Sequence, residues 1–379
     1  MSIKAEPTFS LKDELFNKGK VSKIAGEIEV VYPKFQKRKF VKLVTDRFPE
    51  LELMERLHWI KECLRECLPG DYRAAVGTLL ESLPPPCNPA LRDNDFGDFI
   101  YGPYGAFVAE YGCTKADLQF SLGALKEMTK RFSVEFPIRS FINAFPKETL
   151  NELHLWTQDD HYHVRRLTSE GTRPKLPWAK KIHIHYAAPL PILDALYADS
   201  ARFVTRSVAN HMNDISKVDP DMVIQTLKRW QKLGMQRDKE MSFIVRHSLR
   251  TLEKQGHTEA LQLLGYKQPQ LKVKIKQYSK LVQIGKALEF SFSVTSTANN
   301  TQSLLIDYIL YFQKKDGSLA PKTFKIAKTT IQPVQTQTFS KRQPLRPMTT
   351  RVLYHGRHAF ELQINGENCQ RKEFLLTSS

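Results

Sequence analysis

The chain has 379 residues, which is enough for two domains. Its contents of hydrophobic (41%) and charged (26%) residues are those of a globular protein and exclude large-scale disorder. The net charge of +17 is far from average and favours a polyanionic partner, with nucleic acid or an anionic membrane surface as the usual candidates.

The N-terminal sequence MSIKAEPTFSLKDELF contains no apolar segment of the kind found in a signal peptide. No run of about 18 apolar residues occurs anywhere, so we expect no membrane-spanning helix. The five cysteines form no CxxC pair and are interpreted as reduced thiols. These features together predict a cytoplasmic protein, and a monomer is expected.

Residues 1–266 are predicted to form one mainly helical domain. Segments such as ELMERLHWIKECLREC and PDMVIQTLKRWQKL carry apolar residues at the spacing of an amphipathic helix. Prolines separate these segments into paired helices of about 10–18 residues. Breaks are expected at Pro33, Pro49, Pro69–Gly70, Pro84–Pro86, Pro146, Pro189–Pro191 and Pro220.

A repeat of about 40 residues is visible in the second half of this region. The segments VRRLTSEG, VTRSVANHMND and VRHSLRTLEK begin at Val164, Val204 and Val245, at intervals of 40 and 41 residues. A two-helix unit of this length is typical of HEAT and armadillo repeats, which stack into a curved α-solenoid. The predicted fold is therefore a HEAT-like α-solenoid.

Each of these repeats has a cation near its first valine and an acid five positions before it. The cations are Arg165/Arg166, Arg206 and Arg246, and the acids are Asp159, Asp199 and Glu240. Stacked repeats would align the cations into a ladder suited to a phosphate backbone. The alternative interpretation, given equal weight, is that the arginines form salt bridges within the repeats to Asp159, Asp199 or Glu240.

Residues 267–379 are predicted to form a small β-sandwich. After Gly265 the sequence alternates apolar and polar residues, with turns at Asp316–Gly317 and Asn365–Gly366. Six or seven short strands in about 110 residues are typical of an immunoglobulin-like sandwich. This segment holds 18 Lys and Arg against 6 Asp and Glu, so it carries most of the excess charge. We expect it to contact DNA through Lys341, Arg342 and Arg346 in a loop at 341–351.

The segment WTQDDHYHVRRLTSEGTRPKLPW, residues 156–178, combines tryptophans, acids and arginines beside an irregular turn. With FSVEFPIRSFI (132–142), VTRSVANHMNDISKVDPDMV (204–223) and FIVRHSLRTLEKQGHTEALQLLGY (243–266), it resembles the AlkC/AlkD family of HEAT-like-repeat DNA alkylation-repair glycosylases. The resemblance is closest to the AlkC branch, one class of which carries an immunoglobulin-like domain. Residues 1–130 fit more loosely.

The resemblance implies base excision repair by a monofunctional glycosylase. Its substrates would be cationic alkylated bases, such as 3-methyladenine and 3-methylcytosine, in duplex DNA. Such a base is already a good leaving group, so the enzyme chiefly needs negative charge near the deoxyribose and a positioned water. No cofactor and no metal are expected.

By the resemblance, four residues match the family's catalytic positions. Glu170 and Asp214 would stabilise the transition state and position water, Trp178 would pack against the sugar or lesion, and Glu135 would support them. The cations of the helical region expected to bind DNA are Arg165, Arg166, Arg173, Arg206, Lys217 and Arg246. Taken alone, Glu170 reads as a surface acid, Trp178 as a core residue and Asp214 as an ion-pair partner.

Two further interpretations stay open. A non-catalytic HEAT-repeat scaffold that binds nucleic acid would have the same fold, because a fold does not fix a function. A protein–protein scaffold would leave the basic sandwich unexplained. Tyr101, Tyr104, Phe107 and Tyr111 have helical spacing, and core packing is favoured over base stacking.

Overall fold

The computed structural model describes residues 10–90, 93, 96–347 and 352–378. Its residues group into two compact units. One contains the described residues up to Ile215 together with Gly234–Glu240, and the other contains Ser216–Leu233 and the described residues from Met241 onward. No helix in the described part is long and apolar enough to cross a membrane.

The first unit is built of helices separated at the predicted prolines. Pro146 begins α9, and Pro191 lies in the first turn of α11, positions where the missing proline N–H costs no helical hydrogen bond. The helices are α1 (Leu11–Leu15), α2 (Lys18–Val31), α3 (Lys37–Asp46), α4 (Leu53–Cys67), α5 (Tyr72–Glu81), α6 (Gly102–Tyr111), α7 (Leu118–Met128), α8 (Ile138–Ala144), α9 (Pro146–Leu155), α10 (Tyr162–Glu170), α11 (Leu190–Leu196) and α12 (Arg202–Ile215).

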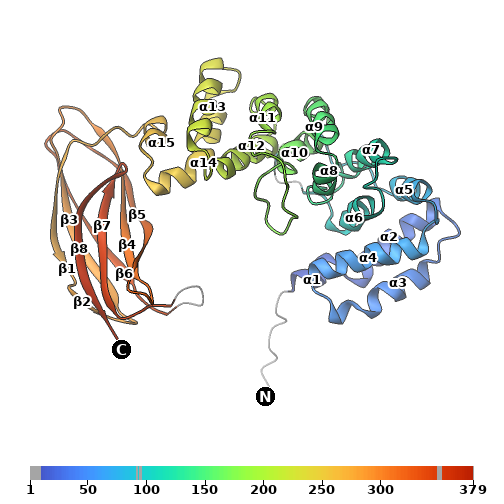
Figure 1. Ribbon diagram of the computed structural model, residues 1–379, viewed down its shortest axis with the longest axis horizontal. Coiled ribbons are helices and arrows are strands. Elements are labelled where there is room, and N and C mark those ends of the chain that lie inside the picture. Colours follow the sequence, from blue (N-terminus) through green and yellow to red (C-terminus); the bar gives the residue numbers. More distant parts are fainter. Residues whose placement is uncertain (1–9, 91–92, 94–95, 348–351, 379) are drawn as a thin grey trace. The chain divides into compact units, whose positions relative to one another are not determined.

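These helices form the two layers of a solenoid. In Figure 1, α7, α9 and α11 lie on one side of the unit and α6, α8, α10 and α12 on the other. Contacts run both within a pair, as between α8 and α9, and along a layer, as between α10 and α12. Val164 and Val204 are fully buried at equivalent places in α10 and α12, so the predicted HEAT-like arrangement is confirmed.

The predicted aromatic stripe packs in the core of this unit. Tyr101 is 4% exposed, and Tyr104 and Phe107 are fully buried. Phe107 also contacts Tyr111 edge-on, with the ring centroids 4.8 Å apart. Core packing, the favoured interpretation, is therefore confirmed over base stacking.

The second unit contains α13 (Pro220–Leu233), most of α14 (Asp238–Gln255), α15 (Thr258–Leu263) and a β-sandwich. The sandwich strands are β1 (Leu271–Tyr278), β2 (Leu281–Gln283), β3 (Ala287–Ser296), β4 (Gln302–Gln313), β5 (Leu319–Ile331), β6 (Thr336–Pro344), β7 (Gly356–Ile364) and β8 (Glu367–Thr377). The predicted domain boundary at residue 267 stays a prediction.

The strands form two sheets, with orders β1-β3-β6 and β2-β8-β7-β4-β5. Every second residue of β3 points inward, and Phe290 and Phe292 pack there against Tyr308 and Phe360. Such alternation between a buried and a solvated face is typical of a sandwich. The architecture is therefore an α-solenoid followed by an immunoglobulin-like sandwich, as predicted.

Two local expectations for the sandwich were wrong. The described residues contain eight strands rather than six or seven. The segment KVKIKQYSKLV (272–282), expected to form one strand, divides into β1 and β2, and β2 pairs in parallel with β8 in the other sheet. No strand was expected where β6 lies. Lys341 and Arg342 lie in β6 rather than in a loop, because β6 pairs with β3 as far as Pro344. Of the expected loop, residues 348–351 lie outside the described residues.

The end of α14 is joined to the sandwich within the second unit. Glu253 forms an ion pair with Lys328 of β5 at 2.6 Å. Asn365, with φ 48°, donates hydrogen bonds to the backbone oxygens of Lys267 and Ser303. A Cβ on Gly366 would lie 2.5 Å from the backbone oxygen of Gly256. The predicted Asn365–Gly366 turn is thus confirmed, and it needs glycine for close approach.

Candidate active site

The candidate site of the first unit lies where α8, α10 and α12 meet. Glu170 is the last residue of α10, and Asp214 lies near the end of α12. Gly171 ends α10 against α8, and a Cβ at this position would lie 2.6 Å from the Ile138 side chain. Glycine therefore lets α10 and its terminal carboxylate approach α8 closely.

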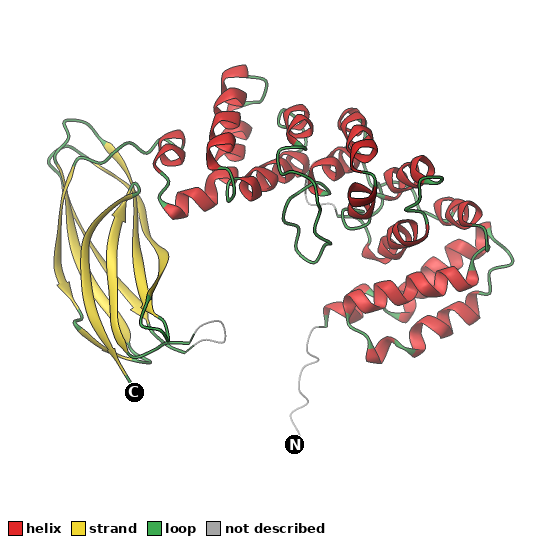
Figure 2. Ribbon diagram, in the orientation of Figure 1, coloured by secondary structure: helices red, strands yellow, loops and turns green. Residues whose placement is uncertain are grey.

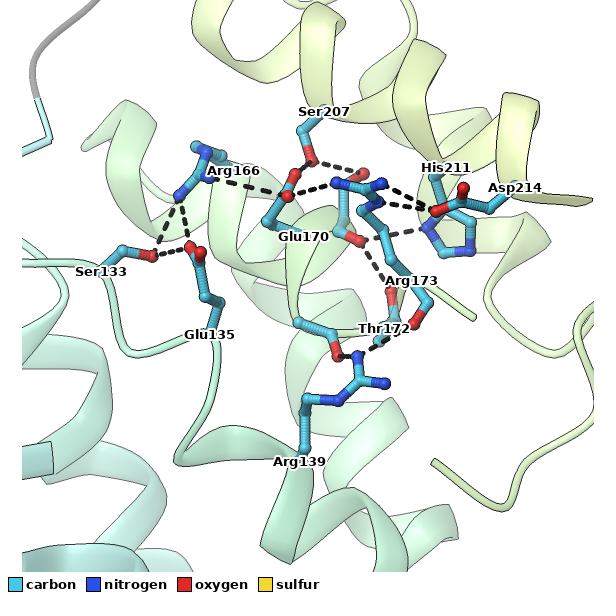
Figure 3. A network of polar contacts seen from close by, with 12 residues as sticks. Ser133, Glu135, Arg139, Arg166, Glu170, Thr172, Arg173, Ser207, His211 and Asp214 are labelled. Atoms are coloured by element: carbon cyan, nitrogen blue, oxygen red, sulfur yellow. Dashed lines mark hydrogen bonds and ion pairs between the residues drawn. The ribbon is translucent and has the colours of Figure 1, made fainter. Parts of the chain in front are cut away.

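Three carboxylates and two arginines alternate across this junction (Figure 3). Arg166 binds Glu135 at 2.8 Å and reaches Glu170 at 3.8 Å. Arg173 donates to Glu170 at 2.6 Å and, through two nitrogens, to Asp214 Oδ2 at 2.8 and 2.9 Å. We call these five residues the charge ladder. It carries one net negative charge when all five are ionised.

The charge ladder keeps its central carboxylate ionised although it is buried. Burial by itself would raise the pKa of Glu170, but the charges of Arg166 and Arg173 hold that pKa below its ordinary value. Burial likewise acts to lower the pKa of Arg173, and the charges of Glu170 and Asp214 raise it above its ordinary value. Glu170 and Arg173 are therefore both charged at neutral pH.

Hydroxyl groups complete the hydrogen bonding of two of these carboxylates. Ser207 of α12 donates to Glu170 Oε2 at 2.6 Å. Ser133 donates to Glu135 and accepts a hydrogen bond from Arg166 at 2.9 Å. A buried carboxylate that accepts several hydrogen bonds has a fixed orientation, which is what electrostatic stabilisation of a transition state requires.

Trp178 lies apart from the charge ladder, in the irregular segment after α10. Its side chain is 80% exposed and its backbone φ is 63°, in the left-handed region that non-glycine residues rarely adopt. Trp178 and Glu135 both line a cavity of about 400 Å³, whose other walls include Phe99, Phe132 and Phe136. Glu135 thus connects the ladder to the cavity that Trp178 borders.

His211 of α12 is buried beside the ladder. Its Nδ1 lies 3.1 Å from the backbone oxygen of Ser169, and Nε2 has no hydrogen-bond partner among the described residues. Since a carbonyl oxygen only accepts, Nδ1 carries the proton in the neutral ring. Burial, with a further contribution from the charge of Arg173, lowers the pKa of His211 to about 4.

This histidine predicts a loss of stability in mild acid. The folded-state pKa lies below the ordinary value of 6.5, so the unfolded chain binds a proton that the folded chain excludes. The contribution of His211 to the free energy of unfolding is therefore fully present above pH 6.5 and is lost towards pH 4, a loss of roughly 3 kcal/mol in all. The difference in unfolding free energy between pH 7 and pH 5, measured with urea, tests this. The His211→Asn variant should show a smaller difference, and an equal difference would contradict the assignment.

Comparison with known proteins identifies the family to which this chain belongs. Residues 272–378 match the family model of the C-terminal Ig-like domain of the uncharacterised protein YhaZ. YhaZ of Bacillus subtilis is 34% identical over 361 residues, which cover 93% of this chain and 96% of YhaZ. The alkylpurine DNA glycosylase AlkC of Pseudomonas fluorescens, solved bound to DNA containing an abasic site analogue, is 35% identical with a TM-score of 0.80 and covers 97% of this chain and 99% of AlkC.

The chain belongs to the AlkC branch of the AlkC/AlkD family. Both its helical region and its Ig-like domain fall within the match to AlkC. The predicted family and fold are therefore confirmed.

Several cations predicted to bind DNA form ion pairs inside this member of the AlkC family. Arg165 binds Asp199 at 2.6 Å, and Arg206 contacts Asp93 at 2.5 Å. Arg166 and Arg173 belong to the charge ladder. Lys217 and Arg246 are exposed. Arg165 therefore does form a salt bridge to a repeat acid, but to the acid of the following repeat rather than within its own repeat as the alternative interpretation expected.

The repeat acids themselves accept cations from the preceding repeat. Asp159 pairs with Lys126 at 2.8 Å, Asp199 pairs with Arg165, and Glu240 pairs with Arg202. The position at which the sequence repeats an acid is thus a link between neighbouring units of the solenoid.

Sequence reasoning gave no role to Ser207, His211 or Arg139. Ser207, His211 and Asp214 are spaced four and three residues apart, so they share one face of α12. This polar face within a buried helix was a signal that could have identified them. Arg139, the single cation of α8, is 1% exposed, and it donates hydrogen bonds to the backbone oxygens of Gly171, Arg173 and Lys180.

Among the described residues, no group of three or more His, Cys, Asp or Glu side chains is arranged to hold a metal ion. His161 and His163 contact the backbone oxygens of Cys87 and Thr129.

Proposed function

We propose that this protein is a monofunctional DNA glycosylase that removes cationic alkylated bases, such as 3-methyladenine and 3-methylcytosine, from duplex DNA. The observation that carries the proposal is the charge ladder, which holds Glu135, Glu170 and Asp214 close together in a member of the AlkC branch. The Pseudomonas fluorescens AlkC, bound to DNA with an abasic site analogue, gives further support.

In the proposed reaction the bond between C1′ of the deoxyribose and the base nitrogen breaks. Its electron pair goes to the base, which leaves neutral because it was cationic in the DNA. Water then supplies the oxygen of the new bond to C1′ and loses a proton. The sugar carries positive charge in this transition state, and fixed carboxylates that are protected from solvent stabilise such charge.

We assign roles to the four candidate catalytic residues on this basis. Asp214 and Glu170 stabilise the sugar cation and orient water, and Glu135 supports them from the side of the cavity. Trp178 offers an exposed aromatic face for the sugar or the cationic base, an interaction of about 0.5–2 kcal/mol. Arg166 and Arg173 hold the carboxylates in place, and any contact that they make with phosphates is additional.

The proposal is tested by single-turnover release of free base. The substrates are duplexes with one 3-methyladenine or one 3-methylcytosine, with no metal added, and an unmodified duplex is the control. We expect release of the alkylated base and an abasic strand that stays intact until treated with alkali. Tight, salt-sensitive binding without release of either base would contradict the proposal and favour the non-catalytic scaffold.

We further propose that the Ig-like sandwich contacts the DNA backbone. Arg346 follows β6, is exposed, and forms no ion pair within the described residues, whereas Arg342 pairs with Glu289 and Lys341 bonds to the Lys325 backbone oxygen. Arg346→Ala is therefore expected to reduce the slope of log affinity against log salt by about 0.9, the value for one phosphate. The affinity of the variant for duplex DNA is measured over a range of salt concentrations. A slope equal to that of wild type would count against this role.

A further inference from the structure

The segment between α10 and α11 has no regular secondary structure and is strongly basic. Figure 2 draws it as a long loop, and residues 171–189 contain no helix or strand. They hold four Lys and Arg residues, two His and no Asp or Glu. We call residues 172–185 the basic arm.

Two side chains of α8 hold the backbone of the basic arm through hydrogen bonds. Arg139 donates hydrogen bonds to the backbone oxygens of Gly171, Arg173 and Lys180. Asn143 donates to the Lys181 oxygen at 2.9 Å and accepts from the His183 N–H at 2.9 Å. These side chains thus hold the irregular backbone at four points of the arm and at Gly171, which directly precedes it.

Arg139 is an unusual anchor, because a buried cation normally has an acidic partner. Its hydrogen bonds to backbone oxygens leave its charge uncompensated by any direct ion pair. Burial, with the added charge of Arg173, accordingly lowers the pKa of Arg139 to about 10. Burying a cation without an acidic partner is costly, and here the buried cation holds the backbone of the arm in place.

Three lysines of the arm reach solvent. Lys175, Lys180 and Lys181 are exposed. None of them forms an ion pair in the part of the chain that the structure describes. This separates them from Arg165, Arg166, Arg173 and Arg206, each of which has a carboxylate partner.

We propose that the basic arm is a preformed DNA-backbone-binding element in which Lys180 and Lys181 contact two phosphates near the site. Binding a phosphate there breaks no ion pair, and the backbone is ordered before DNA arrives, so less freedom is lost on binding. The proposal rests on DNA being the partner in the proposed function. It adds which cations face that partner and how α8 positions them.

The test is the salt dependence of binding to a duplex that contains an abasic site analogue. Wild type is compared with the Lys180→Ala/Lys181→Ala double variant by fluorescence anisotropy. Losing two phosphate contacts should lower the magnitude of the slope by about 1.8 and weaken binding roughly 10- to 60-fold near 0.1 M salt. The control, Lys18→Ala/Lys147→Ala, removes the same charge from exposed positions on α2 and α9 and should leave the slope unchanged.

A variant of Asn143 tests separately whether α8 positions the arm. Asn143→Ala removes two hydrogen bonds to the arm but no charge. It should weaken binding roughly threefold to tenfold through the added cost of ordering, with the wild-type salt slope. A slope for the lysine variant equal to that of wild type, or an equal loss in the control, would overturn the proposal.

Failure of the arm and failure of the glycosylase assignment give different results. The binding assay needs no excision, so a wild type that binds with the expected slopes but releases no base refutes only the glycosylase. Excision with a slope unaffected by the lysine variant refutes only the arm.

Discussion

Replacing Asp214 with asparagine is expected to lower the single-turnover rate of base release by about 100-fold or more. The Asp214 side chain is 4% exposed and is held by two hydrogen bonds from Arg173. Asparagine preserves its size but removes the charge that would face the sugar cation. Loss of one preorganised group that stabilises transition-state charge costs about 10²–10³ in rate. The measurement is release of 3-methyladenine from duplex DNA with enzyme in excess.

A matched variant separates this effect from a general loss of charge. Glu81, at the end of α5, is exposed and has no ion pair among the described residues. Glu81→Gln should therefore retain the wild-type rate. If Asp214→Asn and Glu170→Gln both released base at the wild-type rate, the catalytic assignment would be wrong.

Replacing Arg173 with methionine is expected to lower the free energy of unfolding of the helical unit by about 3–5 kcal/mol. Glu170 and Asp214, 7% and 4% exposed, would lose the cation that lies between them. Removing one partner of a buried ion pair is costly because the remaining charge stays desolvated. Chemical denaturation followed by far-ultraviolet circular dichroism measures the change.

A double variant shows whether the cost comes from the stranded charges. In Arg173→Met/Asp214→Asn one of these charges is absent, so the loss should be smaller than the sum of the two single losses. Arg38→Met, at an exposed position of α3 without an ion pair among the described residues, should change stability by no more than about 0.5 kcal/mol. Strict additivity at Arg173 and Asp214 would show that the ladder does not act as a unit.

Helices and repeats could be predicted because their signals are local. Apolar spacing and proline breaks depend on neighbouring residues, and Val164 and Val204 mark the same place in successive buried helices. The division of one expected strand into β1 and β2 could not be predicted in this way. It depends on β2 pairing with β8, which lies about ninety residues later in the sequence.

The site was predictable only in part. Resemblance to a family identified Glu135, Glu170 and Asp214, and the structure brings these three together through Arg166 and Arg173. Spacing places Arg166 and Arg173 four and three residues from Glu170. It could not show that they also contact Glu135 and Asp214, which lie 31 and 41 residues away in the sequence. The ion pairs of Arg165 and Arg206 also could not be distinguished from phosphate binding in the sequence, because the charge of an arginine does not show which anion lies nearest.

The links between the repeat acids and the preceding cations also bear on how the solenoid deforms. Each repeat of a solenoid touches only its neighbours, so the solenoid bends by small movements at the separate contacts between repeats. Lys126–Asp159, Arg165–Asp199 and Arg202–Glu240 reinforce successive joints at one equivalent position. A force that spreads the repeats should therefore separate them first at the edge away from these ion pairs. The solenoid would bend about the edge that carries the ion pairs.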